Sequence, residues 1–173
     1  MKLPIYLLLL LLCLLTVPVY AAPFYSNLTV TQLEIETDVD SAKPYVSALK
    51  LGYQFAKEFA LEAQFASGAK DDDFGDGKLE VDKMSALFLR IGGQTTYNDV
   101  RLYLLVGRSK TEVKYKDGAV EVKDKFEGNA WGIGAEEYSK AVKNMAYVLE
   151  YVRYNPDSDE KVTGITLGLR YDF

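Results

Sequence analysis

The last residues of the chain alternate strictly between apolar and small or charged side chains. Ile165, Leu167, Leu169, Tyr171 and Phe173 share one parity, and Gly164, Thr166, Gly168, Arg170 and Asp172 share the other. Successive side chains of a strand leave opposite faces, so this pattern predicts a β-strand. In a soluble sandwich the apolar parity would face a core, whereas in a membrane barrel it faces lipid and the other parity lines a narrow lumen. The terminal aromatic residues and the mixture of glycine with charge favour the barrel.

The same period of two recurs along the whole chain after residue 21. It predicts eight strands: about Tyr25–Thr37, Tyr45–Phe55, Phe59–Ser67, Leu79–Gln94, Val100–Lys114, Phe126–Tyr138, Met145–Tyr154 and Val162–Phe173. Short connections alternate with longer polar ones, as in outer-membrane barrels, and closure leaves no unpaired edge in lipid. The predicted fold is therefore all-β, an eight-stranded antiparallel up-and-down transmembrane β-barrel with meander topology.

Two parts of this pattern are less regular. In the first strand Thr29, Thr31, Leu33 and Ile35 compete with Leu28 and Val30 for the apolar face. Residues 68–78 are expected to form a loop. The charged connection 115–125 is centred on the hairpin pair Asp117-Gly118, and a continuation of its strands beyond the bilayer is one interpretation.

The parity opposite to the apolar stripe collects most of the charges in the predicted strands. We expect the lumen to hold a salt-bridge network made of Lys50, Glu62, Arg90, Arg101, Glu136, Glu150 and Arg170. Poorly solvated charges must be paired, and a cation on the lipid side near the midplane would cost about 2–4 kcal/mol. The network is either the polar core of a filled barrel or a gate in a narrow ion path.

The apolar parity predicts the surface that meets lipid and its interfacial aromatic girdle. Its expected members are Tyr53, Phe55, Trp131, Tyr147, Tyr151, Leu167, Leu169, Tyr171 and Phe173.

The first 21 residues have the pattern of an export signal. Lys2 precedes an apolar run from Ile5 to Leu15, and Val19 and Ala21 are the small residues before a cleavage site. We expect residues 1–21 to be a cleaved signal peptide and residues 22–173 to be the barrel domain. The alternative, a retained helix, is disfavoured because the run is short for a membrane span.

The composition narrows the chemistry. The chain has no histidine, its single cysteine is Cys13, and its formal net charge is −5. A catalytic triad with histidine and a cysteine metal site are therefore excluded from the mature chain, and nucleic acid is not an expected partner. Asp71, Asp72, Asp73 and Asp76 lack the spacing of a calcium-binding EF-hand loop. We expect no catalytic residue, no cofactor and no metal.

Several short segments resemble the small OmpA-like and OmpX/Ail-like outer-membrane β-barrel family, a porin-like family. They are Leu51–Phe55 with Phe59–Ala63, Gly132–Glu136, Leu149–Tyr151 and Leu167–Phe173, and together they extend over the mature chain. The resemblance implies eight antiparallel strands in the outer membrane and contact with its lipid and lipopolysaccharide. It also implies insertion by the outer-membrane assembly machinery, with the terminal Phe173 as part of the recognition signal. We expect no counterpart of the peptidoglycan-binding domain of full-length OmpA, and therefore no anchoring to the cell wall.

These observations leave three functions open. The first is a non-enzymatic envelope barrel with a filled polar lumen, whose external loops contact surfaces through partners that the sequence does not identify. The second is a small pore for ions or small solutes. The third is a soluble exported barrel that binds a ligand. The charged segment from Lys110 to Lys125 is a candidate contact for lipopolysaccharide phosphates or host surfaces, but its charges are of mixed sign.

Overall fold

The computed structural model describes residues 23–36, 40–75, 77–94, 100–117, 120–155 and 161–173. The long strands of this part are β1 (Phe24–Glu36), β3 (Tyr45–Ala56), β4 (Phe59–Lys70), β6 (Gly77–Gln94), β7 (Val100–Asp117), β8 (Val120–Tyr138), β9 (Met145–Arg153) and β10 (Lys161–Asp172). Two short strands, β2 (Ser41–Ala42) and β5 (Asp72–Phe74), pair with β1 and β6. The predicted signal peptide, the predicted turn 95–99 and Asp76 lie outside the described residues.

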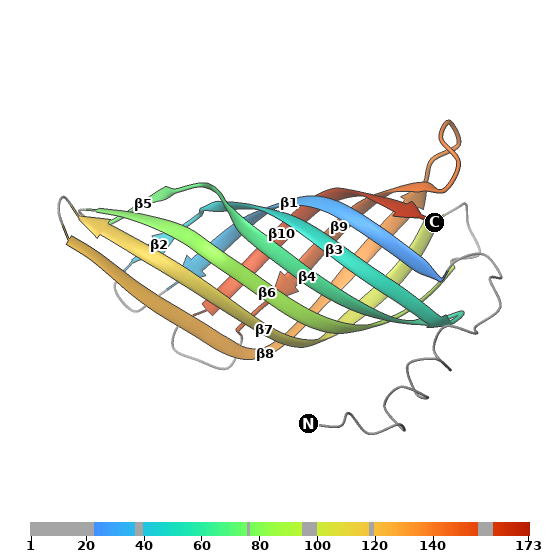
Figure 1. The fold of residues 1–173 in the computed structure, drawn as a ribbon, viewed down its shortest axis with the longest axis horizontal. Coiled ribbons are helices and arrows are strands. Elements are labelled where there is room, and N and C mark those ends of the chain that lie inside the picture. Colours follow the sequence, from blue (N-terminus) through green and yellow to red (C-terminus); the bar gives the residue numbers. More distant parts are fainter. Residues whose placement is uncertain (1–22, 37–39, 76, 95–99, 118–119, 156–160) are drawn as a thin grey trace, which may run out of the picture.

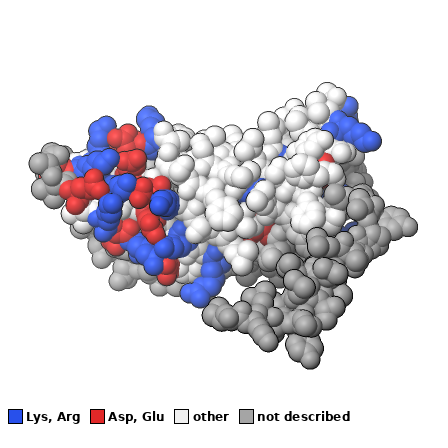
Figure 2. All heavy atoms as spheres, viewed as in Figure 1, with Lys and Arg blue, Asp and Glu red and all other residues white. Residues whose placement is uncertain are grey.

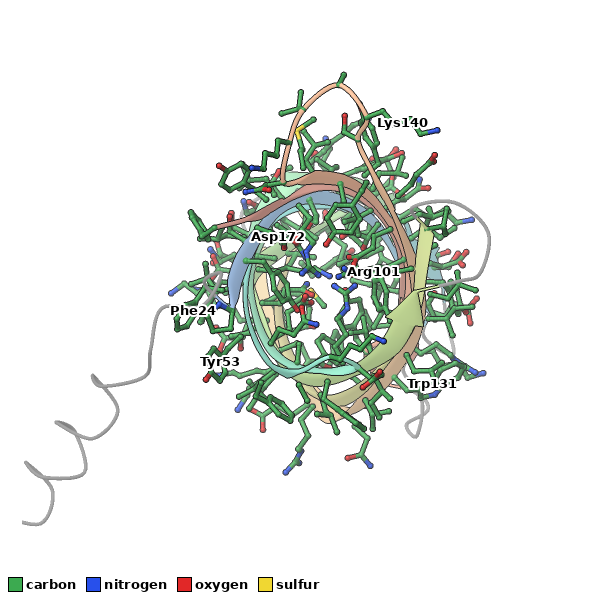
Figure 3. All side chains as sticks on the ribbon, turned by 90° about the vertical axis from the view of Figure 1, so that its right-hand side faces the viewer. Phe24, Tyr53, Arg101, Trp131, Lys140 and Asp172 are labelled. Carbon is green, nitrogen blue, oxygen red and sulfur yellow. The ribbon has the colours of Figure 1, made fainter. Side chains whose placement is uncertain are left out.

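The eight long strands form one closed antiparallel meander (Figure 1). Each pairs with the next along the chain, and β10 closes the cylinder by pairing with β1 from Tyr25–Asp172 to Glu36–Lys161. Figure 3 looks along the cylinder and shows side chains both inside and outside its wall. The predicted eight-stranded antiparallel barrel is confirmed. Among the described residues, no helix combines the length and the apolar character that a membrane crossing requires.

The two ends of the barrel differ. Phe24, the first residue of β1, and Phe173, which follows β10, lie at the end of the barrel where Lys57 and Glu58 form the tight turn between β3 and β4. The Phe173 amide donates to the Phe24 carbonyl at 3.2 Å. Short turns lie on the periplasmic side of such barrels, so we take this as the periplasmic end and the opposite one as the extracellular end.

At the extracellular end, β6, β7 and β8 run far beyond their neighbours (Figure 1). Their lengths are 18, 18 and 19 residues, and the β7–β8 ladder continues to Asp117–Val120. The expectation of a loop over residues 68–78 is wrong, because β4 continues to Lys70 and β5 pairs with the start of β6. The polar residues of these segments are compatible with strands because opposite charges pair between neighbouring strands, as in the diagonal 2.8 Å pair of Lys116 with Glu80.

The extracellular connections are also tied to each other. The Asp40 carboxylate accepts the Gly75 amide at 2.7 Å and the Ser41 amide at 2.8 Å. These two donors hold the pKa of the exposed Asp40 carboxyl below its ordinary value. Asp72 accepts the Lys43 amide at 2.7 Å in the same way. The β1–β3 connection is thereby fixed to β5.

The outer wall is apolar over most of its height. Leu28 and Val30 of β1 point outward with exposed side chains, so the first strand keeps one parity, and its Leu33 and Ile35 are buried inside. Figure 2 shows the result: uncharged atoms form a broad band, and the charged side chains gather at the extracellular extension. The structure thus has an apolar belt of the kind that outer-membrane barrels present to lipid.

Candidate functional site: the lumen of the barrel

Side chains of opposite parity fill the interior at three levels. Nearest the periplasm is a group around Glu136, which we call the mouth cluster. Above it lies a group around Lys50, the central cluster. The extracellular part of the lumen holds buried apolar side chains, the apolar plug, made of Leu33, Ile35, Val46, Leu79, Val81, Met84, Phe88, Leu105, Val113, Phe126, Val152, Tyr154 and Val162.

The central cluster pairs one buried cation with two buried carboxylates. Lys50 forms an ion pair with Glu150 on the far wall, and its Nζ lies 3.7 Å from Glu62 Oε1. The three side chains are completely buried. Two tyrosines complete the arrangement: Tyr25 donates to Glu62 at 2.9 Å and Tyr103 donates to Glu150 at 2.8 Å. These contacts join β3, β4, β9, β1 and β7 across the lumen.

The mouth cluster surrounds one buried carboxylate with three guanidinium groups. Arg90 Nη2 lies 2.5 Å from Glu136 Oε2, Arg170 Nη1 lies 3.2 Å from the same oxygen, and Arg101 Nη1 lies 3.9 Å from Oε1. Arg170 also pairs with Asp172 at 2.7 Å. Arg101 is the outermost member, with 34% of its side chain exposed.

Two of the guanidinium groups of the mouth cluster pack on tyrosine rings. The Arg90 guanidinium lies 3.6 Å from the centre of the Tyr103 ring, and the Arg170 guanidinium lies 3.6 Å from the centre of the Tyr25 ring. Each ring rests on a glycine of a neighbouring strand: a Cβ added to Gly52 would come within 1.9 Å of Tyr25, and one added to Gly134 within 2.3 Å of Tyr103. The glycines make room for the rings that position the arginines.

The seven predicted lumenal charges all point inward. The structure brings Lys50, Glu62 and Glu150 together in the central cluster, and Arg90, Arg101, Glu136 and Arg170 in the mouth cluster. Arg101 differs from the others because it lies at the rim and is partly exposed. The nine predicted girdle and lipid-facing residues, namely Tyr53, Phe55, Trp131, Tyr147, Tyr151, Leu167, Leu169, Tyr171 and Phe173, have outward, exposed side chains. At the periplasmic rim Tyr171 packs edge-on against Phe173 with ring centres 5.4 Å apart.

The sequence analysis missed two features of the lumen. It anticipated a polar interior, whereas the extracellular part is mostly apolar. The inward parity of Phe88 and Leu105 was the available signal, but the outward leucines hid it. It also missed the tyrosines. Tyr103 shares the parity of the charges, and Tyr25 lies in the strand whose parity was ambiguous.

The chemical inventory of the described lumen is limited. It contains hydroxyl, amide, carboxylate, ammonium and guanidinium groups, and within the described residues no group of three or more potential ligands could hold a metal ion. The carboxylates of the two clusters are held by cations and tyrosines. This arrangement can hold strands together across the lumen.

Comparisons with known proteins place the fold. The model of the outer membrane protein beta-barrel domain matches residues 7–173. A search of the curated proteins finds no match. Ail, the attachment invasion locus protein of Yersinia pestis, is similar with a TM-score of 0.64 and 21% identity, over 88% of this chain and 99% of Ail. Neisserial surface protein A has a TM-score of 0.62 and 17% identity, over 88% of this chain and 98% of that protein. OprG from Pseudomonas aeruginosa has a TM-score of 0.62 and 13% identity, over 89% of this chain and 97% of OprG.

At these identities the solved structures support the fold. The family model extends over nearly the whole chain and includes every described strand. The closed antiparallel meander and the apolar outer wall agree with it. The chain belongs to the outer membrane protein beta-barrel domain family, whose members reside in the outer membrane.

Proposed function

We propose that the protein is a non-enzymatic outer-membrane barrel whose lumen is closed to solutes and whose long extracellular strands form a contact surface. The observation that carries the closure is the apolar plug. Its side chains come from seven of the eight long strands, β1, β3, β6, β7, β8, β9 and β10. An ion on this route would exchange water for a lining that is mostly apolar, with Gln64, Ser109 and Thr111 among its few buried polar side chains, which is unfavourable.

The polar layers on the periplasmic side of the plug also close the lumen. An eight-stranded barrel is narrow enough for side chains to fill its interior. Here the central cluster spans that interior with the fully buried Lys50, Glu62 and Glu150. Opening a path would require separating buried ion pairs, so this structure favours a stable closed lumen over the alternative of a small pore. The third alternative, a soluble ligand-binding barrel, requires a polar exterior, and the exterior here is apolar.

Conductance tests the closure. The processed protein, purified and inserted into planar lipid bilayers, is expected to give no steady channel steps in salt solution. Insertion is checked independently by the shift in gel mobility between unheated and boiled samples. Steady, large steps from the wild type, at an incidence that follows protein concentration, would contradict the proposal and favour the pore.

The contact surface lies where the extension meets the apolar belt. The cross-strand rows Ser85–Lys110–Glu127 and Lys83–Glu112–Lys125, together with Arg108, carry four cations and two carboxylates on the outer face. Lys110 pairs with Glu112 at 2.6 Å, and Lys125 pairs with Glu127. Within the described part of the chain, Lys83 and Arg108 have no ion-pair partner. We propose that they bind the phosphate groups of lipopolysaccharide, since cations form strong hydrogen bonds with phosphate.

Replacing Lys83 and Arg108 together tests this contact. Lys83→Gln with Arg108→Gln is expected to remove most of the gain in thermal unfolding midpoint that phosphorylated lipopolysaccharide gives the barrel, because each cation near an anionic lipid surface contributes on the order of 1 kcal/mol. The matched control is Lys78→Gln with Lys116→Gln, which lies nearer to the tip of the extension. Equal gains in both double variants, or an equal gain with dephosphorylated lipopolysaccharide, would contradict the proposed contact.

A further inference from the structure

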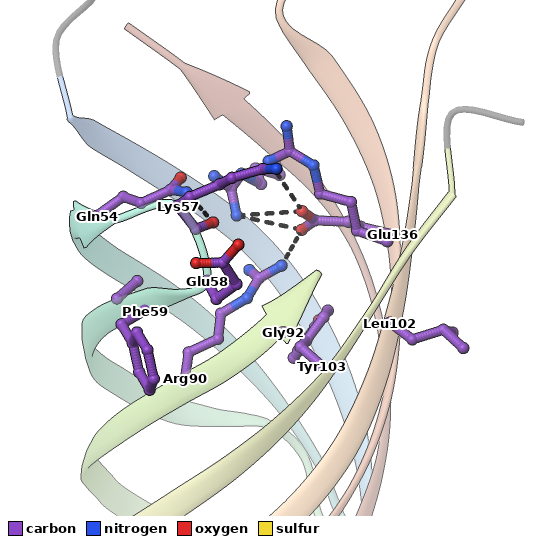
Figure 4. A pocket seen from close by; sticks show the side chains of 12 residues that line it. Gln54, Lys57, Glu58, Phe59, Arg90, Gly92, Leu102, Tyr103 and Glu136 are labelled. Atoms are coloured by element: carbon purple, nitrogen blue, oxygen red, sulfur yellow. Dashed lines mark hydrogen bonds and ion pairs between the residues drawn. The ribbon is translucent and has the colours of Figure 1, made fainter. Parts of the chain in front are cut away.

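The periplasmic mouth contains a hollow that the closed lumen does not explain. Its lining includes Lys57, Arg90, Arg101, Tyr103, Glu136 and Arg170, and its cavity volume is about 20 Å³, room for about one water-sized atom. Figure 4 shows Arg90 and Glu136 pointing toward each other, with Lys57 and Glu58 on the side of the hollow that faces Glu136. A wider hollow at the rim shares Lys57, Arg101 and Arg170 with it.

Positive charge exceeds negative charge in this hollow. Glu136 faces all three guanidinium groups, and Asp172 neutralises one of them through Arg170. Lys57 and Glu58 also line the hollow and carry one charge of each sign. One positive charge is left over. Tyr138 does not compensate it, because its hydroxyl accepts from Arg101 at 3.2 Å and donates to Asp172 at 2.6 Å.

Arg90 supplies the second observation. Its side chain is 7% exposed, its Nη2 pairs with Glu136, and its guanidinium packs on the Tyr103 ring. Its Nη1 is buried and has no hydrogen-bond partner in the described part of the chain. A buried donor of a charged group without an acceptor is costly, so this atom marks a place for an acceptor atom.

We propose that the mouth binds a monoanionic oxyanion, a carboxylate group, from the periplasmic side. One carboxylate oxygen reaches Arg90 Nη1, and Arg101 binds the group from the rim. The single excess positive charge matches a singly charged ligand, and guanidinium–carboxylate hydrogen bonds are among the stronger polar contacts in proteins. The rest of a larger ligand would occupy the wider hollow at the rim. The site lies on the periplasmic side of the apolar plug, so it is independent of whether the lumen conducts.

Titration with acetate tests the site. The probe is sodium acetate exchanged against sodium chloride at constant ionic strength, added to the folded barrel in a neutral sugar detergent that carries no phosphate. The readout is the set of arginine side-chain Nε–H signals in NMR spectra. We expect saturable shifts for Arg90 and Arg101 in the wild type. A response that is linear, or that chloride reproduces, would mean an adventitious ion only and would overturn the proposal.

Three variants sharpen the result. Arg101→Gln at the exposed rim is expected to weaken acetate binding about tenfold by removing one charged donor. Glu136→Gln is expected to strengthen it, because the ligand no longer competes with a resident carboxylate. Arg108→Gln, at the other end of the barrel, is the matched control and should leave the affinity unchanged. Unaltered acetate binding in Arg101→Gln would overturn the proposal, and this test remains available even if Glu136→Gln, at a buried position, fails to fold.

The source of the carboxylate is distinguished by a second probe. N-acetyl-glycylglycine carries the same group on a larger body. Tighter binding than acetate identifies the end of a larger periplasmic molecule, such as a peptide, as the ligand class. Equal binding identifies a small free carboxylate. Absence of binding by both probes contradicts the site.

Discussion

Replacing Lys50 by Met is expected to lower the free energy of unfolding by about 3–5 kcal/mol, the range for removing one partner of a buried ion pair. Lys50 is the cation between Glu150 and Glu62, and the three side chains are fully buried. Methionine fills a similar volume but leaves two carboxylates in the lumen without a counter-charge. Equilibrium unfolding in urea, followed by the fluorescence of the single tryptophan Trp131, measures the loss.

Two controls separate lost charge pairing from lost packing. Lys140→Met changes an exposed lysine in the turn between β8 and β9 and should alter stability by less than about 0.5 kcal/mol. Adding Glu62→Gln and Glu150→Gln to Lys50→Met removes the unpaired charges and should recover most of the loss. If Lys50→Met alone proves nearly neutral, the central cluster is not an ion-paired structural element, and one of the layers assigned to closure is lost.

The wall of the barrel was predictable from the sequence because one physical rule determines it. Side chains alternate along a strand, and the outer face must be apolar along its whole membrane-spanning height. The outward orientation of Leu167 and Leu169 was therefore predictable, and so was the inward orientation of Arg170 and Glu150, which have the opposite parity. This information is local to each strand and does not depend on which strands are neighbours.

The interior was only partly predictable because its polarity changes along the axis. In β1 the inward face passes from Asn27 and Thr29 near the middle to Leu33 and Ile35 at the extracellular end, while Leu28 and Val30 remain outside. Apolar residues then appear on both parities, which is why the strand seemed ambiguous. The level at which each side chain lies follows from the register between strands, which no single strand contains.

The β6 strand adds a second reason. A register shift between Val81 and Lys83 reverses its parity, so Val81 and Met84 both face the plug although they are separated by an odd number of residues. Alternation alone then assigns the wrong face to the residues on one side of the irregularity. The extension of β7 and β8 was anticipated as one interpretation, because the pair Asp117-Gly118 is typical of a hairpin turn. The charged residues of segment 115–125 alone are equally typical of a loop.

The second large effect is expected on the outer wall. Leu104→Arg should lower the free energy of unfolding in lipid by about 2–4 kcal/mol, the cost of an arginine on the lipid face near the midplane. Leu104 lies in the middle of the apolar belt, opposite Ile133 and Ile91 on the neighbouring strands, and it is 52% exposed. The measurement is the urea dependence of folding into lipid vesicles, with the wild type in parallel.

Val122→Arg is the matched control, because Val122 is 53% exposed but lies on the β8 extension beyond the belt. The two positions lose a similar apolar side chain of similar exposure, so only the surrounding medium separates them. A large loss at Leu104 with little change at Val122 means that the belt is in hydrocarbon and the extension is in water. Similar small losses of stability in Leu104→Arg and Val122→Arg would mean that water surrounds the whole outer wall. The alternation of outward leucines with inward charges would then have no physical explanation.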